Sequence, residues 1–186
     1  MKGKEIKNKG LSVEIKLKEG ISAQLDGSVL SLKGSKGDTK RDFPDKNIKI
    51  EYKEGTIIST ANSSKVNKKI INTYAAHMRN MMRGVSEGHK YVLKICSGHF
   101  PMNVSVSNNQ LIVKNFLGEK VPRTLKLKAG ATVKVEGDLI TVESTTKEIA
   151  GQVSADIELL TRRTRYDTRI FQDGIWMISK GGKEVK

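Results

Sequence analysis

The sequence predicts an α+β fold of two duplicated domains, each a small, mainly antiparallel sheet with one helix packed on one face. Short runs of alternating polar and apolar residues, separated by turn pairs, are typical of antiparallel strands. Each half of the 186-residue chain ends its run of strands with one amphipathic helical segment. Two similar segments occupy matching places in the halves, IISTANSSK at 57–65 and LITVESTTK at 139–147. Because a lone amphipathic helix must bury its apolar stripe, each helix is expected to lie on its own sheet.

In the first half, the pattern predicts five strands followed by a helix. The expected strands are 11–17, 21–25, 29–33, 48–53 and 56–60, with turns at Asp26-Gly27 and Glu54-Gly55. The helix is expected from about 65 to 83, because Val66, Ile70, Tyr74 and Met78 recur at intervals of four after a capping segment at 62–64. Residues 34–37, GSKG, open no helix, so they predict a flexible basic loop instead of a phosphate-binding loop.

The second half repeats this order. The expected strands are 91–96, 103–107, 111–114, 132–136, 139–143 and 175–179. Between the last two, an apolar stripe from Ile149 to Leu160 predicts a helix, and Thr145 with Glu148 fits a capping box. Gly151 within this helix costs about 1 kcal/mol relative to alanine, so a strand behind it or a phosphate backbone in front is expected to approach closely. Trp176 is interpreted as a core residue and not as a base-stacking one.

The domain boundary is expected where the periodicity stops, in the segment GVSEGH at 84–89. The predicted domains are therefore residues 1–84 and residues 85–186. The second is expected to carry the main binding surface, because it alone continues past its helix into a dense basic turn and a closing strand.

The formal net charge of +14 and the isoelectric point near 9.8 predict a polyanionic partner, with RNA or DNA first. Charge alone leaves an anionic membrane surface or a merely solvated face open. No stretch approaches the roughly 20 apolar residues of a membrane span. The basic N-terminal stretch lacks the apolar core of a signal peptide, so a cytoplasmic location is expected.

Four arginines within eight positions, Arg162, Arg163, Arg165 and Arg169, form a dense basic segment that only Asp167 offsets. A guanidinium group donates two hydrogen bonds to a phosphate and stacks on unpaired bases, so this segment favours binding of structured RNA. A solvated basic turn is the simpler alternative.

No catalytic or metal-binding constellation stands out. His77, His89 and His99 lie in a helix, a linker and a turn, without metal-ligand spacing, and Cys96 lies in an apolar strand. Asp156 and Glu158 are two positions apart on a helix and point to different faces, which makes a poor acid–base pair. The prediction is a protein that is not an enzyme and has no cofactor, metal or small-molecule substrate. A metal-dependent nuclease is the alternative of another class.

Four ordered motifs carry a resemblance to a known family. They are Gly98-His99-Phe100-Pro101-Met102, the segment VKNFLGEK at 113–120, Ala150-Gly151-Gln152 within the second helix, and Phe171-Gln172-Asp173-Gly174-Ile175. Together they resemble the sixth large-subunit ribosomal protein family in its archaeal form, which eukaryotes share as their ninth large-subunit protein. The resemblance covers nearly the whole chain, including the duplication.

The resemblance implies a structural constituent of the large ribosomal subunit that supports translation. Its implied partners are large-subunit ribosomal RNA, bound chiefly by the second domain near the factor-binding region and the sarcin–ricin loop, and neighbouring ribosomal proteins. A non-ribosomal RNA-binding assembly or regulatory factor is the alternative. The expected RNA-binding residues are Arg162, Arg163, Arg165, Arg169, Lys180, Lys183, His99, Lys114, Lys120, Arg123, Gly151 and Gln152.

Overall fold

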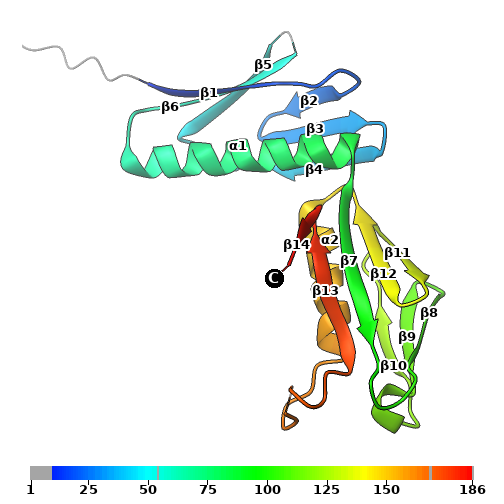
Figure 1. The fold of residues 1–186 in the computed structure, drawn as a ribbon. Helices are drawn as coiled ribbons and strands as arrows, with labels where there is room; N and C mark the ends of the chain where they lie inside the picture. The colour runs from blue at the N-terminus through cyan, green and yellow to red at the C-terminus, as the bar shows by residue number, and fades with distance from the viewer. Residues whose placement is uncertain (1–9, 54, 168, 186) are drawn as a thin grey trace, which may run out of the picture. The chain divides into compact units, whose positions relative to one another are not determined.

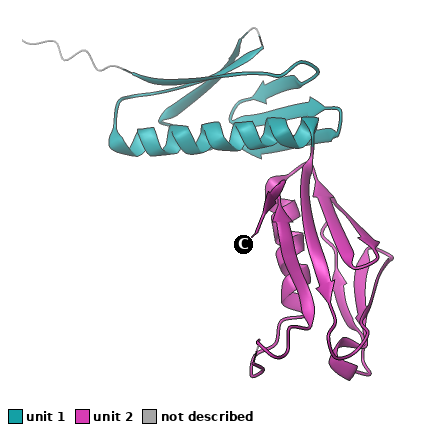
Figure 2. Cartoon of the chain, viewed as in Figure 1, with its two compact units in different colours: residues 1–87 teal, residues 88–186 magenta. Residues whose placement is uncertain are grey.

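The structure is a computed structural model that describes residues 10–53, 55–167 and 169–185. The chain divides into two compact units, Met1–Glu87 and Gly88–Lys186 (Figure 2). Each unit contains small antiparallel sheets and one helix of more than three turns, so the predicted duplicated α+β architecture is confirmed. The basic N-terminal stretch, and Glu54 of one expected turn, lie outside the described residues.

Unit 1 consists of two three-stranded antiparallel sheets and a long helix (Figure 1). The sheets have the orders β1-β6-β5 and β2-β3-β4, and the helix α1, Lys65–Ser86, packs against strands of both. Ser64 caps α1, because its side chain accepts a hydrogen bond from the Val66 amide at 3.3 Å. The strands are β1 Leu11–Lys16, β2 Ser22–Asp26, β3 Val29–Gly34, β4 Gly37–Asp42, β5 Ile48–Lys53 and β6 Thr56–Ala61.

Helix α1 continues past Arg83, where the sequence pattern predicts its end. Val85 is fully buried in the unit 1 core, and its carbonyl accepts a hydrogen bond from the Lys36 amide at 2.9 Å. A Cβ on Gly34 would lie 2.6 Å from that same carbonyl oxygen. Residues 34–37 are therefore the tight turn of the β3–β4 hairpin packed on the last turn of α1, and the expected flexible loop is wrong.

Unit 2 contains a five-stranded and a three-stranded antiparallel sheet with the helix α2, Lys147–Leu160. The sheets have the orders β11-β12-β7-β13-β14 and β10-β9-β8, and their apolar side chains form one core with Ala150, Val153 and Ile157 of α2. The strands are β7 His89–Cys96, β8 Asn103–Ser107, β9 Gln110–Lys114, β10 Arg123–Lys126, β11 Ala131–Glu136, β12 Leu139–Ser144, β13 Gly174–Lys180 and β14 Lys183–Glu184; a 3-10 turn, η1, spans Phe116–Gly118.

The start of α2 and the place of His89 differ from the sequence-based expectation. The N-cap residue is Thr146, one position after the Thr145 expected from the sequence, and the Thr146 side chain itself makes no capping bond. Ser144 instead accepts a hydrogen bond from the Thr146 amide at 3.1 Å. His89 is the buried first residue of β7 and not a linker residue, because β7 starts directly after Gly88.

Candidate nucleic-acid interface

Three loops of unit 2 come together at one end of its sheets. Antiparallel pairing of β13 with β7 places Gly174 opposite Cys96, so the segments 161–173 and 97–102 meet where these two strands begin and end. The third segment, 115–122, is connected to the first by contacts between Arg163 and Glu119. We call these three segments the loop cluster.

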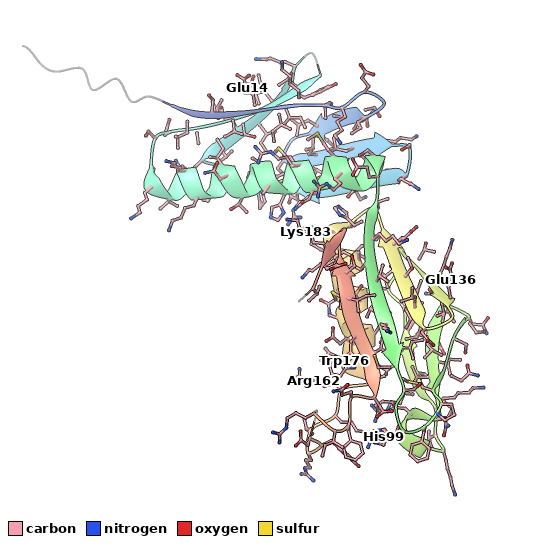
Figure 3. All side chains as sticks on the ribbon, in the orientation of Figure 1. Glu14, His99, Glu136, Arg162, Trp176 and Lys183 are labelled. Carbon is pink, nitrogen blue, oxygen red and sulfur yellow. The ribbon has the colours of Figure 1, made fainter. Side chains whose placement is uncertain are left out.

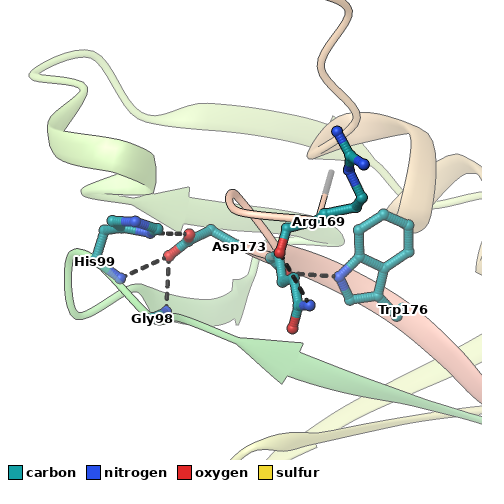
Figure 4. A network of polar contacts seen from close by, with 6 residues as sticks. Gly98, His99, Arg169, Asp173 and Trp176 are labelled. Carbon is teal, nitrogen blue, oxygen red and sulfur yellow. Dashed lines mark hydrogen bonds and ion pairs between the residues drawn. The ribbon is translucent and has the colours of Figure 1, made fainter. Parts of the chain in front are cut away.

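Asp173 fixes the loop at 97–102 to the start of the closing strand β13 (Figure 4). One carboxylate oxygen accepts hydrogen bonds from the amides of Gly98 and His99, at 2.8 and 3.0 Å, and the other contacts His99 Nδ1 at 2.5 Å. Burial by itself would raise the pKa of Asp173, but the hydrogen bonds from the His99 amide, the His99 ring and the Gly98 amide outweigh it, and the pKa lies below its ordinary range. The carboxylate is therefore a buried, charged anchor for a loop whose histidine ring is partly exposed.

Aromatic rings continue from this anchor through the cluster. The His99 ring stacks on Phe171 with centroids 4.8 Å apart, and Phe171 meets the edge of Tyr166 at 5.1 Å. The Arg163 guanidinium lies over the rings of both Tyr166 and Phe116, at 4.9 and 5.2 Å from their centroids. These contacts give the basic segment a defined conformation.

Glu119 holds two of the predicted arginines. Its carboxylate accepts two hydrogen bonds from Arg123, at 2.7 and 2.8 Å, and a further one from Arg163. Arg123 also donates to the carbonyl of Leu160 at the end of α2, at 2.7 Å. The hydrogen bond from Arg123 lowers the pKa of Glu119 most; partial burial opposes it, and Arg163 adds to the lowering.

Replacing Glu119 with alanine is expected to destabilise unit 2 by about 1.5 kcal/mol, the lower end for hydrogen bonds to a charged group, because the site is partly solvated. The readout is denaturant unfolding of the full chain. Glu136→Ala is the matched control, since Glu136 is an exposed carboxylate on a strand of the same unit and should change stability little (Figure 3). Equal free energies of unfolding for Glu119→Ala and Glu136→Ala would contradict the bridging role of Glu119.

The loop cluster contains half of the predicted binding residues, Lys114 and Arg123 lie directly beside it, and these residues have two different environments. Arg162 and Arg165 are exposed and form no ion pair within the described part of the chain. Arg169 is exposed as well and pairs with Asp167 at 2.7 Å. By contrast, the side chains of Arg163 and Arg123 are only 21% and 25% exposed. His99, Lys114 and Lys120 lie in or beside the same loops with exposed surface.

Four predicted residues lie elsewhere. Lys180 and Lys183 lie at the opposite end of β13, where Lys180 pairs in register with Tyr91 (Figure 3). Gly151 and Gln152 lie in the first half of α2, away from its junction with the arginine segment. The nearest side-chain atom to a Cβ on Gly151 would be the Tyr91 hydroxyl at 3.7 Å, so this glycine faces strand β7, the first of the two approaches the sequence left open.

Trp176 is not a core residue, and that prediction is wrong. The neighbouring Ile175 faces the core at 1% exposure, and alternation along β13 places Trp176 outside it, 39% exposed. Its indole Nε1 donates to the Gln172 carbonyl at 3.0 Å.

Glu119, Asp173, Tyr166 and Phe171 organise the cluster, and the predicted set of binding residues contains none of them. Glu119 precedes Arg123 by four positions, a spacing that indicates a pair only within a helix, and this segment is not a regular α-helix. Asp173 belongs to a quoted motif, but its partners lie more than 70 positions earlier. No local signal in the sequence identifies such a contact.

The described residues offer neither a cluster of metal ligands nor a helix that could span a membrane. Within residues 10–53, 55–167 and 169–185, no group of three His, Cys, Asp or Glu side chains is placed to hold a metal ion. No helix in these ranges is long and apolar enough to cross a membrane. Fold and site together define a duplicated α+β protein with a preformed basic loop cluster on its second unit.

Comparison with known proteins identifies the family. The model for "Ribosomal protein L6" matches residues 17–88 and 100–174, one match in each unit. The large ribosomal subunit protein uL6 of Methanosarcina mazei is 43% identical over 173 residues, covering 92% of this chain and 98% of the relative. The corresponding protein of Methanococcus vannielii is 42% identical, over 91% of this chain and 94% of the relative, and that of Ignicoccus hospitalis is 38% identical, over 87% and 90%.

The chain belongs to the ribosomal protein L6 family. The resemblance to the archaeal form is confirmed, since these relatives are archaeal and span nearly the whole chain. Members of this family are structural proteins, so the chain is not an enzyme.

Proposed function

We propose that this protein, by its family a structural constituent of the large subunit of cytoplasmic ribosomes, binds large-subunit ribosomal RNA directly through the loop cluster. The proposed place is the translation-factor-binding region, as the family resemblance implies. Neighbouring ribosomal proteins are the further partners. In this proposal the second unit, residues 85–186 in the sequence-based division, carries the main RNA-binding surface.

The observation that carries the proposal is that the arginines form two groups, one paired with Glu119 and the other exposed to solvent. Arg163 and Arg123 neutralise Glu119 and fix the loops, whereas Arg162 and Arg165 extend outward with their charges uncompensated in the described structure. The contacts of Arg163 hold the segment that carries these cations before binding, which lowers the conformational entropy lost on association. Exposed guanidinium groups on a preformed loop suit the phosphates of a folded RNA.

The remaining predicted residues have different roles in this proposal, according to their distance from the loop cluster. Arg169, His99, Lys114 and Lys120 contact the RNA at the edge of the loop cluster. Lys180 and Lys183, at the other end of β13, would reach only a separate RNA segment. Gly151 and Gln152 act on the helix itself, because Gln152 donates to Asp156 at 2.8 Å and Gly151 faces β7.

The test is binding of the purified protein to deproteinised large-subunit ribosomal RNA, with small-subunit ribosomal RNA as the control. We expect tighter binding to the large-subunit RNA, with an affinity that falls steeply as salt rises. The protein should also remain with salt-washed large subunits at about one copy per particle. Equal affinity for both RNAs, together with release from the particle in moderate salt, would favour an assembly or regulatory factor instead.

A further inference from the structure

A cavity of about 660 Å³ lies beside the loop cluster, between the C-terminal end of α2 and the start of β13. Its volume lies within the range of about 300–1,000 Å³ typical of pockets that bind small organic groups. Leu159, Tyr166 and Trp176 line it, and all three side chains are substantially exposed. Exposed large apolar side chains gathered around one cavity indicate a binding site.

The geometry of Trp176 leaves its ring available for contact. The indole N–H of Trp176 already donates a hydrogen bond to the Gln172 carbonyl, so this donor is satisfied within the chain (Figure 4). A Cβ on Gly174 would come within 3.3 Å of the same nitrogen, and the absent side chain at this position lets the indole lie close to the strand. What the indole offers a ligand is therefore an oriented aromatic surface, which suits stacking.

The charges around the cavity favour a nucleotide over an apolar peptide. Arg162 lines the cavity with an exposed guanidinium group, and the adjoining segment adds Arg165. Glu158, also in the lining, offers a carboxylate that can accept hydrogen bonds from an amino group of a base. An aromatic surface combined with a cation is the arrangement by which proteins bind single unstacked bases.

We propose that this cavity receives one unstacked base of the bound RNA, which stacks on Trp176 while Arg162 contacts the adjacent phosphate. The proposal rests on the RNA-binding function proposed above and adds to it a specific point of recognition. A side chain of a neighbouring protein is the competing occupant.

The chain has a single tryptophan, so fluorescence excited selectively at tryptophan, and not at the four tyrosines, reports on this cavity alone. Titrating the full-length protein with large-subunit ribosomal RNA is expected to quench that fluorescence in step with binding measured by filter retention. RNA that binds without changing the fluorescence would overturn the base-insertion proposal and leave the proposed function standing. RNA that does not bind would overturn both.

Replacement of the aromatic ring gives an independent readout. Trp176→Leu is expected to weaken RNA binding roughly tenfold, within the range measured for loss of one base-stacking side chain, and Trp176→Phe to restore part of that loss. Tyr52→Leu is the matched control, since Tyr52 is a 40% exposed aromatic residue of unit 1. The RNA affinity of the Tyr52→Leu variant should equal that of the wild type. Thermal unfolding verifies that each variant is folded.

The competing occupant is tested in the intact particle. Photocrosslinking of large subunits assembled with 5-bromouridine-substituted RNA is expected to join Trp176 or Tyr166 to a nucleotide. Equal RNA affinities of Trp176→Leu and wild type, or a crosslink from Trp176 to another ribosomal protein, would overturn the proposal.

Discussion

Replacing Arg162 and Arg165 together with glutamate is expected to weaken binding to large-subunit ribosomal RNA by about tenfold for each arginine. Each cation that neutralises a phosphate releases counterions, so losing two such contacts should also lower the slope of log affinity against log salt by about 2. The fold should be unaffected, because neither arginine pairs with an acidic group in the described ranges. Filter binding over a series of salt concentrations measures both quantities.

The control for this variant changes the net charge by the same amount elsewhere on unit 2. Lys126→Glu with Lys134→Glu reverses two exposed cations on β10 and β11, outside the loop cluster. We expect this control to lose much less affinity than the arginine variant. Equal losses in the two double variants would mean that only overall charge matters and would contradict a localised interface.

Removal of the Asp173 carboxylate is expected to release the loop that carries His99. In Asp173→Ala, the amides of Gly98 and His99 lose their shared acceptor, and unit 2 should be destabilised by about 1.5–3 kcal/mol, the contribution of hydrogen bonds to a charged group. Hydrogen exchange measures this most directly, because protection of these two amides should be lost in the variant. Unchanged protection would contradict the anchoring role.

The same carboxylate predicts a dependence of stability on acid. The pKa of Asp173 is lower in the folded protein than its unfolded value of about 3.9, so its contribution is complete above that pH and is lost as the pH falls through the folded-state value. Glu119, whose pKa is also lowered, adds a loss of the same sign. Asp173→Asn should therefore be less stable than the wild type near neutral pH and lose less stability on acidification, as measured by urea unfolding across pH.

Local sequence patterns predict most of this fold, because alternation of polar and apolar residues marks most strands and capping residues mark the start of a helix. Alternation identifies β5 and β8 with the bounds that the structure has, and Ser64 caps α1 within the segment expected to do so. Strands β4 and β10 escape prediction because charged and polar side chains dominate their sequences, GDTKRD and RTLK. Their positions depend on pairing with β3 and β9, which lies beyond a local pattern.

Only part of the candidate site can be predicted from the sequence, for a physical reason. A cluster of arginines can be identified in the sequence, but the exposure of each side chain cannot. Arg163 differs from Arg162 because it contacts Glu119, 44 positions earlier, and the rings of Phe116 and Tyr166. Trp176 illustrates the same limit, since hydrophobicity favours the core while the alternation set by Ile175 places it at the surface.

Residue-level crosslinking of the protein to RNA in intact large subunits tests the central claim most directly. The loop cluster, and above all the segment from Arg162 to Tyr166, should yield the strongest crosslinks to large-subunit ribosomal RNA. Crosslinks confined to unit 1 or to the Lys180–Lys183 end of unit 2, with the loop cluster joined only to other proteins, would contradict the assignment of the RNA-binding surface.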